Sequence, residues 1–267
     1  MKQLAIAIYC VNYHSYDSLH NYLRSIEKAA GKAGKAAEVS VIVADNTIPA
    51  EPLTYNPTQF SLKVFTTGNN LGYFGAVEYA FKQVQPADFD YIIISNVDVL
   101  MTEDSIVELT KTNLNTSIGW IAPRLYSTTH QFDWNPQAIS RYPKKKLRIM
   151  QFLFKHPFLL FLKQRIFHQY RHISSYPAGA DIYAAHGSFI LLTKHFFERC
   201  GGIHYPVFLY FEEIYLAEEC RKHQLKVVYM PQIEISDIGS VSTGKMPAKT
   251  YCKYNHEGVS FILSHYY

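Results

Sequence analysis

Residues 91–99 have the sequence YIIISNVDV, in which the apolar run 91–94 is soon followed by Asn96 and Asp98. A short apolar run of this kind is typical of a strand buried inside a parallel sheet. The same pattern occurs twice upstream, at residues 4–13 (LAIAIYCVNY) and 39–46 (VSVIVADN). The chain therefore predicts several buried strands that end in polar side chains.

Apolar residues at helical spacing separate these runs, at Leu19, Tyr22, Leu23 and Ile26 and again at Phe74, Val77, Phe81 and Val84. Ser15 or Asp17 is expected to begin the first helix, and Thr102 to cap one that carries Ile106 and Leu109. Further strands are expected at 62–65, 118–122, 182–192, 227–230 and 233–235. Further helices are expected at 194–199 and in the stretch that follows residues 208–213 and ends at His223. This alternation predicts an α/β fold with a mostly parallel central sheet flanked by helices.

Ligands of such sheets bind at the carboxyl ends of the strands, where the polar residues of this chain fall. Any one of these residues could serve only to form a turn. The coincidence of three polar strand ends in one half of the chain favours a site there.

Length and composition fit one large domain, because the chain has 267 residues of which 48% are hydrophobic. No apolar run is long enough to span a membrane, and residues 4–11 are too short for a signal peptide. The four cysteines lie far apart, so we expect free thiols in a reducing compartment. The expected location is cytoplasmic, with peripheral attachment to the inner face of the cell membrane as an option.

Charge is distributed unevenly along the chain. Residues 135–180 hold nine Lys and Arg and no Asp or Glu, whereas the remaining chain holds 17 basic and 22 acidic side chains. An acidic body is a poor partner for nucleic acid, so none is expected. The basic, aromatic-rich insert could be an amphipathic segment on an anionic membrane, or a helical hairpin packed on the body or on a second copy.

Short motifs follow one another over nearly the whole chain: 11–13 (VNY), 43–46 (VADN), 69–75 (NNLGYFG), 95–99 (SNVDV), 186–189 (HGSF), 201–203 (GGI), 208–213 (FLYFEE), and Ser236-Asp237 up to Ser242. Each motif alone is weak, but the ordered set resembles the inverting family 2 glycosyltransferases of GT-A fold. It is most similar to bacterial rhamnosyltransferase-like members that build surface polysaccharides.

The resemblance implies a nucleotide-sugar donor, a UDP- or dTDP-sugar, held by Asn12, Tyr13, Asp45, Asn70, Gly72 and Asn96. It also implies a divalent cation, Mg²⁺ or Mn²⁺, at Asp98, with Asp237 as a second ligand. The leaving diphosphate gains charge as its bond to the sugar breaks, and a hard cation on oxygen ligands can absorb that charge.

The resemblance places the catalytic base at Glu213, and the acceptor, a saccharide that is expected to be lipid-linked, beside Gly187 and Glu212. An inverting displacement needs one carboxylate opposite the leaving group to take the proton of the attacking hydroxyl. The chain departs from the family in three places, where Glu213 and Tyr215 replace Asp and Asp237 replaces His.

The resemblance also implies one domain, 1–267. It comprises a donor-binding half (1–125), the basic insert (135–180), an acceptor and catalytic half (181–245) and a C-terminal segment (246–267). The oligomeric state stays open. A sugar-phosphate nucleotidyltransferase is disfavoured, because residues 12–17 lack the Gly-rich, basic loop that such an enzyme needs. A degenerate, non-catalytic protein that serves as an assembly or membrane-docking factor remains the alternative.

Overall fold

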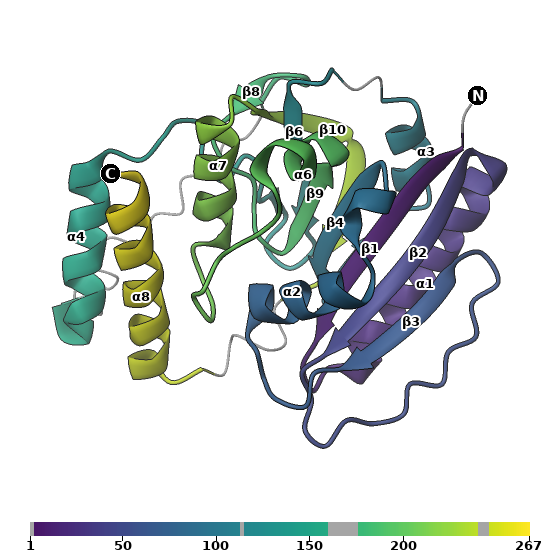
Figure 1. Cartoon of the computed structure of the whole chain (residues 1–267), viewed down its shortest axis with the longest axis horizontal. Helices are drawn as coiled ribbons and strands as arrows, with labels where there is room; N and C mark the ends of the chain where they lie inside the picture. The colour runs from purple at the N-terminus through teal and green to yellow at the C-terminus, as the bar shows by residue number, and fades with distance from the viewer. Residues whose placement is uncertain (1–2, 113–114, 160–175, 240–245) are drawn as a thin grey trace.

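The computed structural model describes residues 3–112, 115–159, 176–239 and 246–267. Its centre is a ten-stranded sheet whose main path runs β3-β2-β1-β4-β9-β6-β10-β5 (Figure 1). The strands are β1 (Leu4–Asn12), β2 (Ala37–Asp45), β3 (Ser61–Thr66), β4 (Tyr91–Asn96), β5 (Val99–Met101), β6 (Ile118–Ser127), β7 (Phe132–Asp133), β8 (Asp181–Ile182), β9 (Phe189–Thr193) and β10 (Lys226–Asp237). The predicted α/β architecture is therefore confirmed.

The first four strands of the path are parallel and bring the predicted polar ends together. In this register Asn12 of β1 lies opposite Asp45 of β2, and Val11 lies opposite Asn96 of β4. Side chains alternate across β1, so that Tyr9 belongs to one hydrophobic cluster and Ile8 to the other. Helix α1 (Tyr16–Ala33) covers one face and α2 (Tyr73–Gln83) the other (Figure 1).

The second half of the sheet is mixed, because β9 runs antiparallel between β4 and β6 while β6 and β10 are parallel. Three local predictions were wrong. Residues 182–192 do not form one strand, since 183–188 connect β8 to β9. The two strands expected at 227–230 and 233–235 are one strand, β10, whose register shifts between Met230 and Glu234. Thr102 does not cap the next helix as expected. Its hydroxyl donates to the carbonyl oxygen of Glu234, and α3 (Ser105–Thr110) begins after Asp104.

The remaining helices are α4 (Lys144–Lys155), α6 (Lys194–Cys200), α7 (Glu212–Lys222) and α8 (Ala248–Tyr266). Helix α4 confirms that part of the basic insert is helical, and it lies along α8 at the side of the molecule opposite α1 and β3 (Figure 1). Residues 160–175 of the insert, and Ser242 of the last motif, lie outside the described residues. The predicted boundaries of the two halves stay a prediction, although the sheet is continuous across them through the β4–β9 pair.

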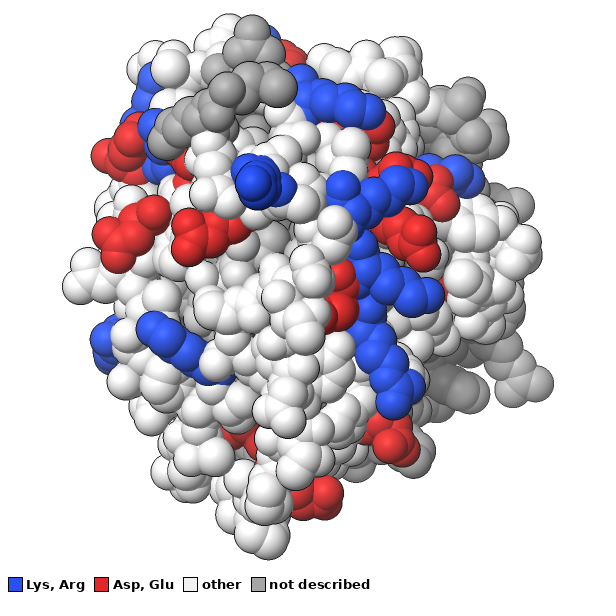
Figure 2. Space-filling model, turned by 90° about the vertical axis from the view of Figure 1, so that its right-hand side faces the viewer, with Lys and Arg blue, Asp and Glu red and all other residues white. Residues whose placement is uncertain are grey.

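All four cysteines are free thiols, as expected. Within the described residues, no helix has the length and apolar character that crossing a bilayer demands. On the side that carries α1 and β3, basic side chains lie next to acidic ones (Figure 2). Lys32 of α1, for example, pairs with Asp104 at 2.8 Å.

Candidate active site

A cavity of about 730 Å³ opens at the carboxyl ends of the parallel strands. Segments from the whole length of the chain line it, and they include most of the predicted site residues: Tyr13, Asn70, Gly72, Asn96, Asp98, Gly187, Glu212, Glu213 and Asp237. The two predicted carboxylates with the most different tasks, Asp98 and Glu213, therefore share one cavity although 115 positions separate them in the sequence.

Asn12 and Asp45 do not line the cavity but lie buried behind its wall. The Asn12 side-chain amide donates to Asp45 Oδ1 at 3.0 Å, and the Tyr16 hydroxyl donates to Asp45 Oδ2 at 2.6 Å. The neighbouring Asn46 lines the cavity and donates its amide to the carbonyl oxygen of Gly72 at 2.9 Å. The predicted contact of Asn12 and Asp45 with the nucleoside stays a prediction.

The loop before α2 approaches the segment before α7 very closely. Gly72 has φ +77°, and a Cβ atom there would lie 2.1 Å from the carbonyl oxygen of Phe208. The next residue, Tyr73, donates its backbone N–H to the same oxygen at 3.1 Å. Only glycine accommodates both the left-handed backbone and this approach.

Asp98 and Asp237 lie on neighbouring stretches of chain. Strands β5 and β10 pair antiparallel, with Asp237 opposite Val99, and the backbone N–H of Ile238 donates to the carbonyl oxygen of Asp98 at 3.3 Å. Both carboxylates line the cavity. Two carboxylates in one cleft form a donor set that suits a hard divalent cation, so the residues fit the expected Mg²⁺ or Mn²⁺.

Asp237 is held in place by two hydrogen bonds. The Trp134 indole N–H donates to its Oδ2 at 2.6 Å, and the backbone N–H of Gly239 donates to its Oδ1 at 2.9 Å. Each carboxylate oxygen has further acceptor capacity, so these bonds orient the group and leave it able to bind a cation. Among the described residues, the one group of three side chains placed to hold an ion is Cys200, Glu219 and His223, which does not line this cavity.

Glu212 and Glu213 form the first turn of α7, directly after two residues with positive φ, Tyr210 (75°) and Phe211 (69°). The backbone N–H of Tyr210 donates to Glu212 Oε1 at 2.9 Å. Burial raises the pKa of Glu213 to about 7. Burial, together with the charge of Glu213, raises the pKa of Glu212 to about 8. The site thus holds two carboxyl groups that exchange protons near neutral pH.

Gly187 borders this pair, because a Cβ atom on it would lie 3.7 Å from Glu213 Oε2. Its carbonyl oxygen accepts a hydrogen bond from the Tyr73 hydroxyl at 3.1 Å. The structure therefore brings the predicted acceptor-binding glycine next to the predicted base.

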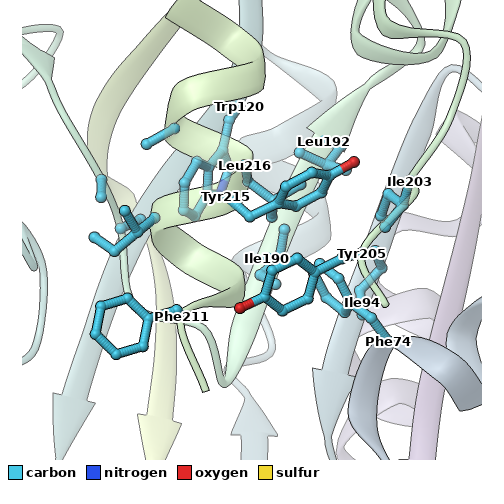
Figure 3. Packing of buried hydrophobic residues seen from close by; sticks show 14 of the residues in the cluster. Phe74, Ile94, Trp120, Ile190, Leu192, Ile203, Tyr205, Phe211, Tyr215 and Leu216 are labelled. Carbon is cyan, nitrogen blue, oxygen red and sulfur yellow. The ribbon is translucent and has the colours of Figure 1, made fainter. Parts of the chain in front are cut away.

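Tyr215, where the resembled family has an acidic residue, belongs to the core. Its ring stacks on Tyr205 with centroids 4.9 Å apart, and its hydroxyl accepts from the backbone N–H of His204 at 2.8 Å. In Figure 3 the rings of Tyr215 and Tyr205 lie among buried side chains that include Phe74. This departure from the family pattern therefore changes the packing behind α7 and not the lining of the cavity.

Trp134 and His186 line the cavity and were missed as site residues by the sequence analysis. Their rings stack with centroids 5.3 Å apart, and His186 Nδ1 lies 2.9 Å from the Ser188 hydroxyl oxygen. Burial lowers the pKa of His186 to about 4, so its ring is neutral at physiological pH. The rarity of tryptophan, with only two in the chain, was the one available signal for Trp134.

No protein-family model matches the chain. A curated relative, the N-acetylglucosaminyl-diphospho-decaprenol L-rhamnosyltransferase of Mycobacterium tuberculosis, is 24% identical over 96% of this chain and 83% of that protein. The same relative is found in two strains of that organism.

Two solved structures are similar in fold. The mannosyltransferase PcManGT from Pyrobaculum calidifontis, in complex with GDP-Man and Mn²⁺, has a TM-score of 0.53 at 11% identity, over 91% of this chain and 59% of that one. GalNAc-T7 with UDP, GalNAc and Mn²⁺ has a TM-score of 0.55 at 13% identity, over 92% of this chain and 45% of that one. The present chain thus spans less than two thirds of either solved chain.

These likenesses confirm the GT-A fold predicted from the sequence. They also confirm the resemblance to rhamnosyltransferase-like glycosyltransferases, which the order of the motifs had indicated.

Proposed function

We propose that this protein is an inverting glycosyltransferase that moves a sugar from a nucleotide-diphosphate donor to a lipid-linked saccharide in bacterial surface polysaccharide synthesis. The observation that carries the proposal is the shared cavity of Asp98 and Glu213, one beside the donor-binding strand ends and the other at the start of α7. The name of the curated relative supports L-rhamnose as a candidate sugar and a diphospho-lipid as a candidate acceptor.

In the donor half, Asn70 and Gly72 form the wall against which the nucleotide diphosphate would lie. The Asn70 side-chain oxygen accepts from the backbone N–H of Gly72 at 3.0 Å, which fixes the loop. Asp98 and Asp237 would hold the divalent cation, and the solved Mn²⁺ complexes of the same fold favour such a requirement. When bound, the cation would stabilise the charge that develops on the diphosphate.

In the acceptor half, Glu213 would take the proton of the attacking hydroxyl. The hydroxyl oxygen forms a bond to C1 of the donor sugar, the bond from C1 to the diphosphate oxygen breaks, and the nucleoside diphosphate leaves with that electron pair. A pKa of about 7 leaves a large fraction of Glu213 ionised at neutral pH and keeps it basic enough to accept the proton. Glu212, with a pKa of about 8, is mostly protonated there and can donate a hydrogen bond to the acceptor.

The proposed donors are UDP- and dTDP-sugars, and the proposed location is the cytoplasm, next to the membrane that holds the acceptor. A direct test measures transfer from these donors to a diphospho-lipid acceptor, for the wild type and Glu213→Gln. We expect Glu213→Gln to lower kcat by roughly 100-fold or more while the dissociation constant for the nucleoside diphosphate stays the same. Unchanged turnover would refute the role of Glu213.

The non-catalytic alternative makes a different prediction. An assembly or docking factor needs no nucleotide, so titration calorimetry with UDP, dTDP and GDP in the presence of Mn²⁺ would detect no binding. Binding of one of them that is lost in Asp98→Ala supports the transferase.

A further inference from the structure

Helix α4 presents two different faces. Positions 147, 150, 151 and 154 follow the i, i+3, i+4, i+7 pattern of one helix face and point inward. Leu147 and Phe154 on it are buried, and Gln151 donates to the Ser260 hydroxyl of α8 at 2.8 Å. Met150 and Phe154 also line the cavity that holds Glu213. The inner face of α4 is therefore a wall of the candidate active site.

Positions 145, 148, 149 and 152 repeat the same spacing on the opposite side, and we name them the outer face. Ile149 and Phe152 there are 49% and 55% exposed, and Phe158 just beyond the helix is 74% exposed. Large apolar side chains in water are costly, and their grouping on one helix face indicates a surface that becomes covered.

The cations on and next to the outer face have no acidic ion-pair partner among the residues that the structure describes. Lys145 and Arg148 lie beside the two apolar side chains, and Lys155 follows one turn later. None of the three forms an ion pair with another residue of the described ranges, whereas Lys32 and Lys111 elsewhere each have a carboxylate partner. Because residues 135–180 contain no Asp or Glu, every charged side chain of α4 itself is basic.

This combination selects among partners. A second copy of the chain would bring the same cations together, which costs free energy. A nucleic acid would match the charge but leave Ile149 and Phe152 uncovered. The surface of an anionic bilayer satisfies both features, because headgroups pair with the cations while apolar side chains enter the acyl boundary.

We propose that the outer face of α4 binds the surface of an anionic membrane. A second step rests on the proposed function. It places the lipid chain of the diphospho-lipid acceptor in that bilayer and the sugar of the acceptor inside the cavity. One helix, about 10 Å across, separates the outer face from the inner face. The saccharide therefore needs to extend only past α4 to reach Glu213.

The test is co-sedimentation of the full chain with vesicles made of equal parts phosphatidylglycerol and phosphatidylcholine, with pure phosphatidylcholine vesicles as reference. Two double variants alter the outer face, Lys145→Glu/Arg148→Glu and Ile149→Ser/Phe152→Ser. Their matched controls make the same chemical changes at exposed positions on the other side of the molecule, Lys35→Glu/Lys63→Glu and Ile48→Ser/Val64→Ser. Circular dichroism checks that every variant is folded.

We expect the wild type and both controls to bind the anionic vesicles, and each outer-face variant to bind at least about tenfold more weakly. Added salt should weaken the wild-type binding. Wild-type protein that stays in the supernatant, equal binding of variants and controls, or a dimer in solution that the outer-face variants disrupt would overturn the proposal. Transfer to a soluble, short-chain acceptor separates the two hypotheses, since it should be intact in the outer-face variants. Vesicle binding without any transfer would refute the proposed function and leave the membrane surface supported.

Discussion

Gly72 and Phe208 lie in backbone contact, since a Cβ atom on Gly72 would lie 2.1 Å from the Phe208 carbonyl oxygen. That oxygen also accepts the N–H of Tyr73, at 3.1 Å, so the loop before α2 is joined to the segment that leads into α7. Residues more than 130 positions apart thus meet without a side chain between them.

The substitution Gly72→Ala tests this contact, with Gly68→Ala in the same loop as its control. Both glycines have positive φ, but a Cβ atom on Gly68 meets nothing within 4 Å. Gly68→Ala should therefore cost only about 1–2 kcal/mol of backbone strain. Gly72→Ala adds a clash and should lower the free energy of unfolding by roughly a further 1–3 kcal/mol.

Denaturant titration measures both stabilities, and calorimetry measures the affinity for the nucleoside diphosphate. We expect that affinity to fall only in Gly72→Ala. Equal losses in the two variants would show that the approach to Phe208 is unimportant.

A second prediction concerns Trp134, whose indole N–H donates to Asp237 at 2.6 Å. Trp134→Phe keeps an aromatic ring but removes the donor, and loss of such an orienting bond lowers metal affinity by roughly 10- to 100-fold. The measurement is the Mn²⁺ concentration needed for half-maximal nucleotide binding. Trp120→Phe is the matched control, because the Trp120 indole N–H has no hydrogen-bond partner in the described residues. A shift of the same size in both variants would argue against the role of Trp134.

The carboxyl pair predicts a bell-shaped dependence of kcat on pH. As the proposed base, Glu213 must be ionised to accept a proton, so activity should rise as pH increases through about 7. In its proposed role, Glu212 must be protonated to donate to the acceptor, so activity should fall above about 8. The variant Glu212→Gln separates the two ionisations. This variant should keep the rise and lose the fall. A profile that is flat between pH 6 and 9 (a window of roughly one unit on either side of the pair) would contradict both roles.

The raised pKa of Glu212 predicts that stability falls as pH rises, which is the opposite of the effect of most carboxylates. The pKa of Glu212 rises from 4.5 to about 8 on folding, so the folded state binds more protons within that window. Its contribution to stability is complete below about 4.5 and is lost as pH rises toward 8. Glu212→Gln should therefore raise Tm relative to the wild type at pH 8 more than at pH 5. Glu257→Gln, at an exposed position on α8, provides the control. A difference in Tm that does not change with pH would contradict this prediction.

Local sequence patterns predicted those elements of the fold that depend on local apolar patterns and on strand pairing. The strand at 91–94 is almost entirely apolar, and parallel pairing then aligns its polar end with those of β1 and β2. Thr102 misled the prediction, because its hydroxyl bonds to the carbonyl oxygen of Glu234, 132 positions away, and leaves Asp104 to precede the helix. A tertiary hydrogen bond of this kind leaves no mark in the local sequence.

The candidate site was predictable only where its residues stand in sequence motifs. Asp98 and Glu213 stand in motifs, and the structure places both in one cavity. Trp134 belongs to no motif and reaches Asp237 only through the pairing of β6 with β7 and β10. Asp45, conversely, stands in a motif but is buried against Asn12 and Tyr16, an arrangement that depends on neighbouring strand ends.

The last prediction concerns Arg141, which joins the start of the basic insert to α7. Its Nε and Nη2 donate to Glu218 Oε1 and Oε2 at 2.7 and 3.0 Å, and the Glu218 side chain is fully buried. Arg141→Ala removes two hydrogen bonds from this buried carboxylate, so it should lower the free energy of unfolding by roughly 1–3 kcal/mol. Arg221 also donates to Glu218 Oε2, at 2.9 Å, and keeps the loss from growing larger. Arg124→Ala breaks the more exposed pair with Glu234 and should cost at most about 1 kcal/mol. Denaturant titration measures the loss of stability in both variants. Equal losses would mean that Arg141 does not anchor the insert.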